Sequence, residues 1–250
     1  IQARKDVTVL TNLMESRPLF GNARLEKQLA VKLSPKRLWN VHDYFRAKTD
    51  EQLARHHFYN DTAYNLEPHI KEGPGGLRDI QTITWITQRH FGSRDFTELI
   101  KHNFLTAEEY RMLIRGRNFL WKLRNALHFL SKRREDRLLF DYQKDIAQEF
   151  GYQNDRKSLA VEKLMKRYFR TVKELRFLND LLIQYFQQTI LSHEEQFVVD
   201  INPRFRSVGG LIETKNASVF QKQPFALLEI FLLLQQRSDV NGIQASTIRQ

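Results

Sequence analysis

The chain has 250 residues, 41 % of them hydrophobic, so it is long and apolar enough to bury a core. It has no cysteine, which excludes disulfides, thiolate metal sites and cysteine nucleophiles. No uncharged apolar run of about 18 residues and no signal sequence is present, so we expect a cytoplasmic protein that does not contact membranes. The net charge of +11 indicates attraction for phosphate groups, although Lys and Arg also simply solvate helix faces.

The first half of the chain is predicted to be mainly helical. Ser34 is followed by a proline and is predicted to cap a helix that runs to about His57. Residues 61–69 have mixed spacing and predict a loop. Residues 77–91 predict the next helix, and Gly92 is its stop signal.

The second half begins with a long helix opened by Thr106 and Glu109, which have the spacing of a capping box. Its inward positions are predicted to be Leu113, Leu120, Leu123, Leu127 and Leu130. Asp141 is predicted to cap a short helix that ends at Gly151. Residues 159–191 form the longest periodic stretch, with a core stripe at Leu164, Tyr168, Val172, Leu175, Leu178, Leu182 and Tyr185.

A change in composition follows this stretch. Residues 197–201 and 211–213 are β-prone and flank a turn-rich segment, which predicts a small β-hairpin near 197–213. Pro224 is predicted to open another helix, and Asn241-Gly242 to separate it from a last short one. The predicted fold class is therefore mainly α, a helical bundle with a small β-hairpin insertion.

The most unusual segment is the glycine-rich junction before the helix at 77–91. Gly73, Gly75 and Gly76 permit close backbone approach, and a helix N-terminus presents free N–H groups, so the junction is a candidate phosphate site. It matches neither the Walker A loop nor the dinucleotide-binding fingerprint. A tight turn that only enters the helix explains the same glycines.

Charged residues flank this junction. Lys71 and Arg78 add positive charge, and Glu72 and Asp79 are predicted to orient these cations or to hold a cation themselves. In the purely structural alternative, Arg78 and Asp79 form local salt bridges.

The histidines offer a weaker candidate. The pair His42-Asp43 is compatible with a metal-dependent hydrolase if other helices supply further ligands, for which His56 and His57 are candidates. An ordinary polar pair on an amphipathic helix is the favoured explanation of His42-Asp43.

A basic helix and its exit form the third feature. Phe119 and Trp121 interleave with cations, namely Arg115, Arg117, Lys122, Arg124, Lys132, Arg133, Arg134 and Arg137. This pattern is typical of nucleic-acid interfaces, but Glu135 and Asp136 interrupt it. A wall that faces a nucleotide or a protein substrate fits the same residues.

The glycine-rich segment also carries a family resemblance. It reads Tyr64-Asn65-Leu66-Glu67-Pro68 and then Ile70-Lys71-Glu72-Gly73-Pro74-Gly75-Gly76-Leu77-Arg78-Asp79-Ile80-Gln81. This resembles the signature of bacterial PII uridylyltransferases and, more distantly, a motif of glutamine synthetase adenylyltransferases. Further similar stretches extend from Thr11-Asn12-Leu13 to Thr247-Ile248-Arg249, so the resemblance covers nearly the whole chain.

The resemblance implies an enzyme that transfers UMP from UTP to a tyrosine of the PII protein and removes it again, with glutamine as effector. It implies a polymerase-β-like nucleotidyltransferase core whose Mg²⁺-binding aspartates lie largely upstream of Ile1, and HD and ACT domains after Gln250. No position in this chain matches a catalytic aspartate. We therefore expect a fragment that is inactive alone.

The implied domain organisation is the C-terminal part of the nucleotidyltransferase region with connecting helices over 1–70, and the helical domain over 71–250. The expected nucleotide- or acceptor-positioning residues are Lys71, Glu72, Gly73, Gly75, Gly76, Arg78 and Asp79. The expected partners are PII, UTP and glutamine, without nucleic acid. The alternatives are a nucleic-acid-binding helical module and a non-catalytic interaction scaffold.

Overall fold

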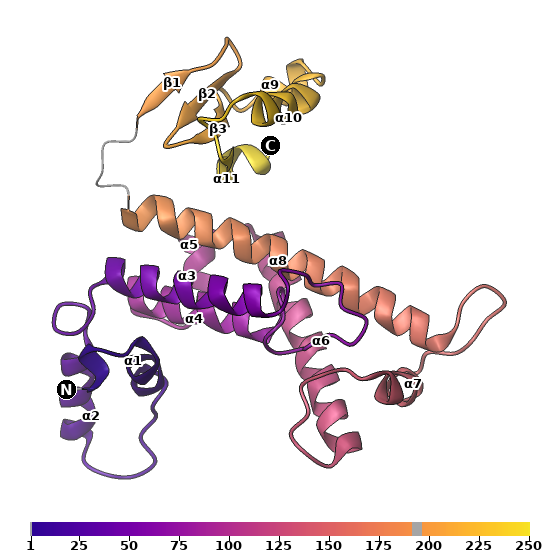
Figure 1. The fold of residues 1–250 in the computed structure, drawn as a ribbon. Coiled ribbons are helices and arrows are strands. Elements are labelled where there is room, and N and C mark those ends of the chain that lie inside the picture. The colour runs from indigo at the N-terminus through magenta and orange to yellow at the C-terminus, as the bar shows by residue number, and fades with distance from the viewer. Residues whose placement is uncertain (1, 192–196) are drawn as a thin grey trace. The chain divides into compact units, whose positions relative to one another are not determined.

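A computed structural model of the chain describes residues 2–191 and 197–250, and helices dominate it (Figure 1). The prediction of a mainly α fold with a small β element is confirmed. The chain forms two compact units, Ile1–Ile183 and Gln184–Gln250. The predicted regions 1–70 and 71–250 concern the organisation of a larger enzyme and stay a prediction.

The first unit is helical throughout. No helix in the described ranges has both the length and the apolar composition needed to cross a membrane. Its elements are η1 Gln2–Arg4, α1 Val7–Met14, α2 Ala23–Leu33, α3 Val41–Phe58, α4 Leu77–Phe91, α5 Thr97–Lys101, α6 Ala107–Ser131, α7 Phe140–Glu149 and the first part of α8 Ala160–Leu191.

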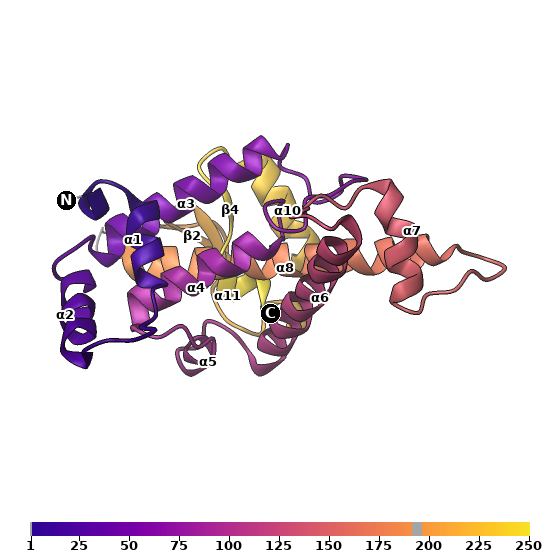
Figure 2. The same cartoon turned by 90° about the horizontal axis from the view of Figure 1, so that it is seen from below.

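Helices α3 and α4 form an antiparallel pair that carries the candidate site (Figures 1 and 2). At one end, Arg55 of α3 contacts Asp79 of α4. At the other end, the guanidinium of Arg89 lies 5.6 Å from the ring centre of Tyr44. The glycine-rich loop connects the two helices, so its geometry is set by how they pack.

Several predictions made from local sequence patterns are confirmed. The side chains and backbone of Thr106 and Glu109 make the reciprocal hydrogen bonds of a capping box at the start of α6. Gly92 ends α4 in the left-handed region, with φ of 77°. The stripe on α8 is buried from Leu164 to Leu182, because its three- and four-residue spacing places these side chains on one face, whereas Tyr185 is only partly buried.

Other predictions for this unit are wrong at the level of single residues. Ser34 ends α2 instead of opening a helix, and Asn40 caps α3 through its side chain. Asp141 lies inside the first turn of α7, which begins at Phe140. Leu130 is 37 % exposed, because α6 ends at the next residue and its last turn leaves the core. Helices α1 and α2 were not predicted.

The second unit contains a four-stranded sheet in the order β1-β2-β3-β4. Strands β1 (Val198–Asp200), β2 (Phe205–Val208) and β3 (Leu211–Thr214) are antiparallel neighbours, and β4 (Gly242–Ile243) is parallel to β3. Helices α9 (Val219–Lys222), α10 (Ala226–Gln236) and α11 (Ala245–Ile248) complete the unit. Its core includes Phe205, Ile212 and Ile230.

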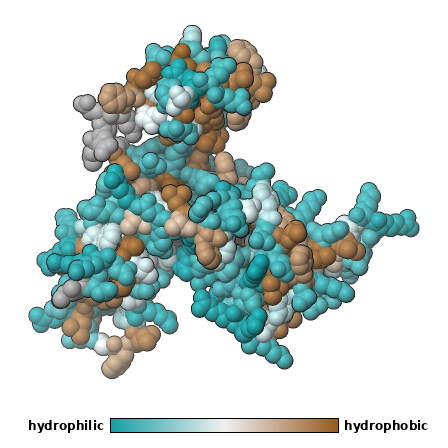
Figure 3. Space-filling model, viewed as in Figure 1, coloured by the Kyte–Doolittle hydropathy of each residue, from teal (hydrophilic) through white to brown (hydrophobic). Residues whose placement is uncertain are grey.

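The predicted β element near 197–213 exists, but its central segment was misassigned. Phe205 and Ser207 are buried on either side of the exposed Arg206, and they belong to an inner strand where a turn was expected. Gly242 separates two helices, α10 and α11, as predicted, but it does so as part of a strand. Hydrophobic surface is visible on this unit (Figure 3) and comes in part from α10, at Leu227, Leu228, Phe231 and Leu232.

Candidate functional site

The glycine-rich loop folds back on the first turn of α4. The N–H of Leu77 donates to the carbonyl of Ile70 at 3.2 Å, and the N–H of Arg78 donates to the carbonyl of Lys71 at 2.8 Å. These are the N–H groups that a phosphate at the helix N-terminus would need. Because carbonyls of the loop already occupy them, a phosphate held by this helix terminus is not supported.

Asp79 is the centre of the junction and is 1 % exposed. Its carboxylate accepts hydrogen bonds from Arg55 Nη2 at 2.7 Å, from His56 Nε2 at 2.9 Å and from the N–H of Gly75 at 2.7 Å. A buried charge is tolerated only when it is paired and hydrogen-bonded, and both oxygens of Asp79 meet this requirement. The carboxylate therefore fastens the loop and the end of α3 to the start of α4.

The ion pairs in the structure differ from those expected if the junction were only a turn into the helix, in which Arg78 and Asp79 form local salt bridges. Arg78 does not pair with Asp79; it pairs with Glu72, through Nε at 3.2 Å and Nη2 at 3.0 Å. The sequence did not indicate that Arg55 and His56 would be the partners of Asp79. Their only signal was that both lie in the last turn of a helix, where basic residues are common.

Two cationic side chains, Lys71 and Arg78, surround the half-buried carboxylate of Glu72. Lys71 Nζ lies 3.3 Å from Glu72 Oε1, on the side chain that also binds Arg78. Burial alone would raise the pKa of Glu72, but the hydrogen bonds from Arg78 and the charges of Arg78 and Lys71 outweigh it and hold this pKa below its usual value. Glu72 thus stays ionised and orients Arg78, which also lies over the ring of Trp85.

The carboxylates of this cluster do not suit Mg²⁺. Arg55, His56 and Gly75 occupy the oxygens of Asp79, and Arg78 faces both oxygens of Glu72. No group of three His, Asp or Glu in the described part of the chain is arranged to hold a metal ion. The metal in the reaction implied by the resemblance is therefore not assigned to Glu72 or Asp79.

The three glycines of the junction are packed against backbone. A Cβ added at Gly75, where φ is +75°, would lie 2.2 Å from the carbonyl oxygen of Val172 on α8. A Cβ at Gly73 or Gly76 would meet loop carbonyls at 2.9 and 2.7 Å. Gly75 thus lets the loop pass close to α8, and Gly73 and Gly76 let the loop fold tightly on itself, which accounts for the clustering of the glycines without a ligand.

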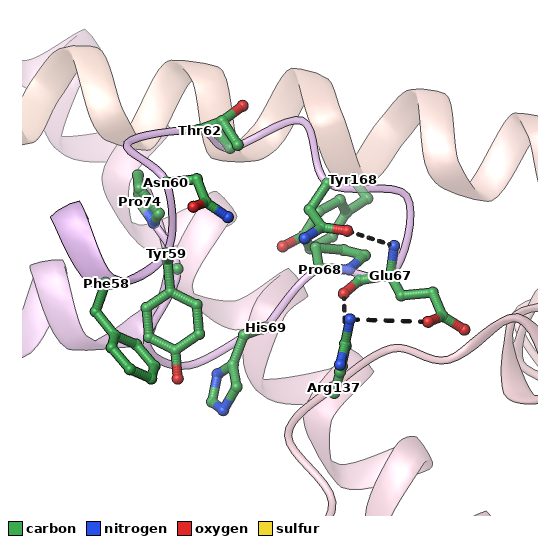
Figure 4. A pocket seen from close by; sticks show the side chains of 13 residues that line it. Phe58, Tyr59, Asn60, Thr62, Glu67, Pro68, His69, Pro74, Arg137 and Tyr168 are labelled. Atoms are coloured by element: carbon green, nitrogen blue, oxygen red, sulfur yellow. Dashed lines mark hydrogen bonds and ion pairs between the residues drawn. The ribbon is translucent and has the colours of Figure 1, made fainter. Parts of the chain in front are cut away.

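A pocket of about 330 Å³ adjoins the loop and includes Gly73 and Pro74 in its wall (Figure 4). The predicted loop at residues 61–69 supplies many of the other walls. The lining residues from this loop are Thr62, Ala63, Asn65, Glu67, Pro68 and His69, and the remaining ones are Phe58, Tyr59, Asn60, Arg137 and Tyr168.

His69 links this pocket to the junction. Its Nδ1 accepts a hydrogen bond from the N–H of Glu72 at 2.9 Å, so the neutral ring carries its proton on Nε2. Burial lowers the pKa of His69, against the opposing charges of Asp136 and Glu72. The ring is therefore neutral at pH 7.

A pH effect on stability follows from this ring. The unfolded chain takes up a proton at His69 near pH 6.5, whereas the folded chain resists protonation until a lower pH, so the free energy of unfolding falls as pH falls below about 6.5. In His69→Asn, whose side-chain oxygen can accept the same backbone hydrogen bond, we expect a smaller loss of stability between pH 7.5 and pH 5.5. Urea unfolding at the two pH values measures the difference.

The matched control is His57→Asn, because the side chain of His57 is 87 % exposed. We expect this variant to lose as much stability as the unmodified chain over the same pH interval. An unchanged pH dependence in His69→Asn would show that His69 does not remain neutral in the fold.

The other sequence candidates do not assemble into a site. His42 Nδ1 lies 3.2 Å from Asp43 Oδ1 in an exposed pair at the start of α3, as in the polar-pair interpretation. His56, considered as a further metal ligand, is buried against Asp79 and does not join this pair.

The exit of the basic helix is largely neutralised by local ion pairs. Arg124 donates to Asp136 at 2.5 Å, and Arg133 donates to Glu135 at 2.8 Å. Arg137 lies 3.9 Å from Glu67. The acidic residues that interrupt the basic run are thus its partners, which weakens the case for a nucleic-acid interface along this segment.

Comparison with known proteins gives a consistent picture. Residues 43–183 match the family described as GlnD PII-uridylyltransferase, and residues 205–250 match the uridylyltransferase GlnD third domain. Over 248 residues the chain is 49 % identical to the bifunctional uridylyltransferase/uridylyl-removing enzyme of Nitrosococcus oceani and 46 % identical to that of Pseudomonas syringae pv. tomato. Each alignment covers 99 % of the chain but 28 % of the relative. No solved structure matches the chain.

Proposed function

The chain belongs to the GlnD PII-uridylyltransferase family, and from this premise we propose that it is part of an enzyme that transfers UMP from UTP to a tyrosine of the PII protein. The observation that carries the proposal is the family match over residues 43–183, which contain the whole glycine-rich junction. Removal of UMP, control by glutamine and a cytoplasmic location belong to the same proposal. The chain spans 28 % of the length of these relatives, and the residues that bind Mg²⁺ are proposed to lie outside it.

In the proposed reaction, the tyrosine oxygen attacks the α-phosphorus of UTP. A bond forms between this oxygen and phosphorus, the bond to the bridging oxygen breaks, pyrophosphate leaves and the phenolic proton is released. Negative charge grows on the leaving group, so correctly placed cations accelerate the step.

The junction is proposed to position the nucleotide or the acceptor protein in this reaction. Lys71 and Arg78 keep side chains 16 % and 25 % exposed, so they remain reachable although Glu72 orients both. Asp79, Gly73, Gly75 and Gly76 would act indirectly, by fixing the loop that carries these cations. The support is the geometry of this cluster together with the family match.

A segment exchange tests the function. The 248 matching residues of the Nitrosococcus oceani enzyme are replaced by this chain, and the chimera is incubated with PII, Mg²⁺ and UTP labelled at the α-phosphate. We expect label on PII well above a control without enzyme. A folded chimera that labels no PII, alongside an active parent enzyme, would contradict the proposal.

Arg78→Ala in this chimera tests the role of the junction. If Arg78 positions a substrate, we expect kcat/KM for transfer to fall by about 10-fold or more, which corresponds to about 1.4 kcal/mol in the barrier. The assay is run well below the melting temperature of the variant, so that all molecules are folded. Normal turnover combined with a lowered melting temperature would leave Arg78 a purely structural residue.

A further inference from the structure

The pocket in Figure 4 has an aromatic wall that no role assigned so far explains. The ring centres of Phe58 and Tyr59 are 5.1 Å apart, and those of Tyr59 and His69 are also 5.1 Å apart. Phe58 is 78 % exposed, so its ring is accessible to a ligand. Aromatic side chains placed together at a pocket mouth favour a planar ligand ring.

Hydrogen-bond donors complement this wall. His69 presents an Nε2–H, because its Nδ1 accepts from the backbone of Glu72. Arg137 is 55 % exposed and is tethered to Glu67, whose carbonyl accepts from its Nε at 3.3 Å. Asn65 accepts from the N–H of Glu67 through its side-chain oxygen, which directs its amide as a donor.

The aromatic wall and the hydrogen-bond donors together limit the kind of ligand that this pocket can bind. A ring with carbonyl acceptors on its edge can use the donors of His69, Asn65 and Arg137 while its face lies against Phe58 or Tyr59. A volume of about 330 Å³ is near the lower limit of small-molecule pockets, which run from about 300 Å³ upward, so it suits a ring with its sugar. Uracil presents two carbonyl oxygens on a small planar ring and fits this description.

We propose that this pocket, formed by Phe58, Tyr59, Asn65, His69 and Arg137, binds the uracil ring of a uridine nucleotide. The choice of uridine rests on the proposed function, whereas the planar ring with acceptor groups follows from the pocket itself. The backbone of the pocket is held firmly, because the N–H of Leu138 donates to the carbonyl of Pro68 at 2.9 Å and the N–H of Ile70 donates to the carbonyl of Asp136 at 2.8 Å. The glycine-rich segment thus supplies both the junction and one wall of the base site.

Binding of UMP to the 250-residue chain tests the pocket directly. Saturation-transfer NMR should show strong transfer to the H5 and H6 protons of the base. In Phe58→Ala we expect UMP to bind about 10-fold more weakly, because stacking of a base on an aromatic ring is worth roughly this factor or more. Phe58→Trp should restore the affinity.

Controls separate base recognition from charge. Ribose 5-phosphate carries the phosphate without the base, and we expect it to bind at least about 10-fold more weakly than UMP and to be insensitive to Phe58→Ala. Phe129→Ala removes a phenylalanine that is 84 % exposed and lies outside the pocket, and it should leave UMP binding unchanged. Because both replaced side chains are exposed, neither variant should unfold the chain.

Three outcomes would overturn the proposal: equal binding of UMP and ribose 5-phosphate, unchanged UMP binding in Phe58→Ala, or equal binding of AMP and UMP. The segment exchange keeps the two proposals apart. An active chimera whose KM for UTP is unaffected by Phe58→Ala refutes the pocket alone. An inactive chimera made from a chain that binds UMP refutes the transfer function alone.

Discussion

Asp79→Asn is expected to lower the free energy of unfolding by about 3–5 kcal/mol, the range seen when one partner of a buried ion pair is removed. Asp79 accepts from Arg55 and His56 on Oδ1 and from the N–H of Gly75 on Oδ2. Asparagine has one oxygen and one NH2 group, so in either orientation a donor faces a donor. Arg55, whose side chain is only 12 % exposed, also loses its closer acidic partner and keeps only the longer ion pair with Glu72 at 3.9 Å. Urea unfolding of the 250-residue chain measures the change.

Asp145→Asn is the control for this substitution, since Asp145 is exposed on α7 and surface changes of this kind usually stay within about 0.5 kcal/mol. Combining Asp79→Asn with Arg55→Met should cost less than the sum of the two single changes, because the second change removes the charge whose closest partner the first takes away. If Asp79→Asn matched Asp145→Asn within error, the buried cluster would not hold the junction as described.

Elements with signals close together in sequence were predicted well. Gly92 ends α4 at the predicted residue, and Thr106 with Glu109 opens α6, because a left-handed stop and a capping box each depend on a few adjacent residues. The stripe on α8 was found because its period persists over many turns. Helix α2 has no buried residue, so it lacks the core face from which such a period is recognised.

The candidate site was predicted in its residues but not in its contacts. Asp79 meets Arg55 and His56 from 24 and 23 residues away, through the packing of α3 on α4, which no local pattern encodes. The free N–H groups expected at the start of α4 are occupied, because the loop turns back far enough for the carbonyls of Ile70 and Lys71 to reach them. The pocket was missed for a related reason. Its walls come from the end of α3, the loop before α4, Arg137 and α8, and only the fold brings these segments together.

Gly75→Ala is expected to destabilise the chain by about 2–5 kcal/mol, the sum of two separate costs. A residue with a Cβ at φ of +75° is strained by about 1–2 kcal/mol. The added carbon would also lie 2.2 Å from the carbonyl oxygen of Val172, and forcing an extra methyl group into packed surroundings costs about 1–3 kcal/mol. The obstacle is backbone of α8, which cannot rotate away as a side chain would.

Gly92→Ala separates the two costs, because Gly92 has nearly the same φ, +77°, but nothing within 4 Å of the added Cβ. It should show the backbone strain alone, about 1–2 kcal/mol by urea unfolding. The difference between the two variants then measures how closely the glycine-rich loop approaches Val172. Equal losses would mean that the loop can withdraw from α8 without cost, and the loop would then be too loosely held to position the Lys71 and Arg78 cations. A larger loss in Gly75→Ala identifies the contact with α8 as what fixes the junction, and with it the wall of the pocket that Gly73 and Pro74 form.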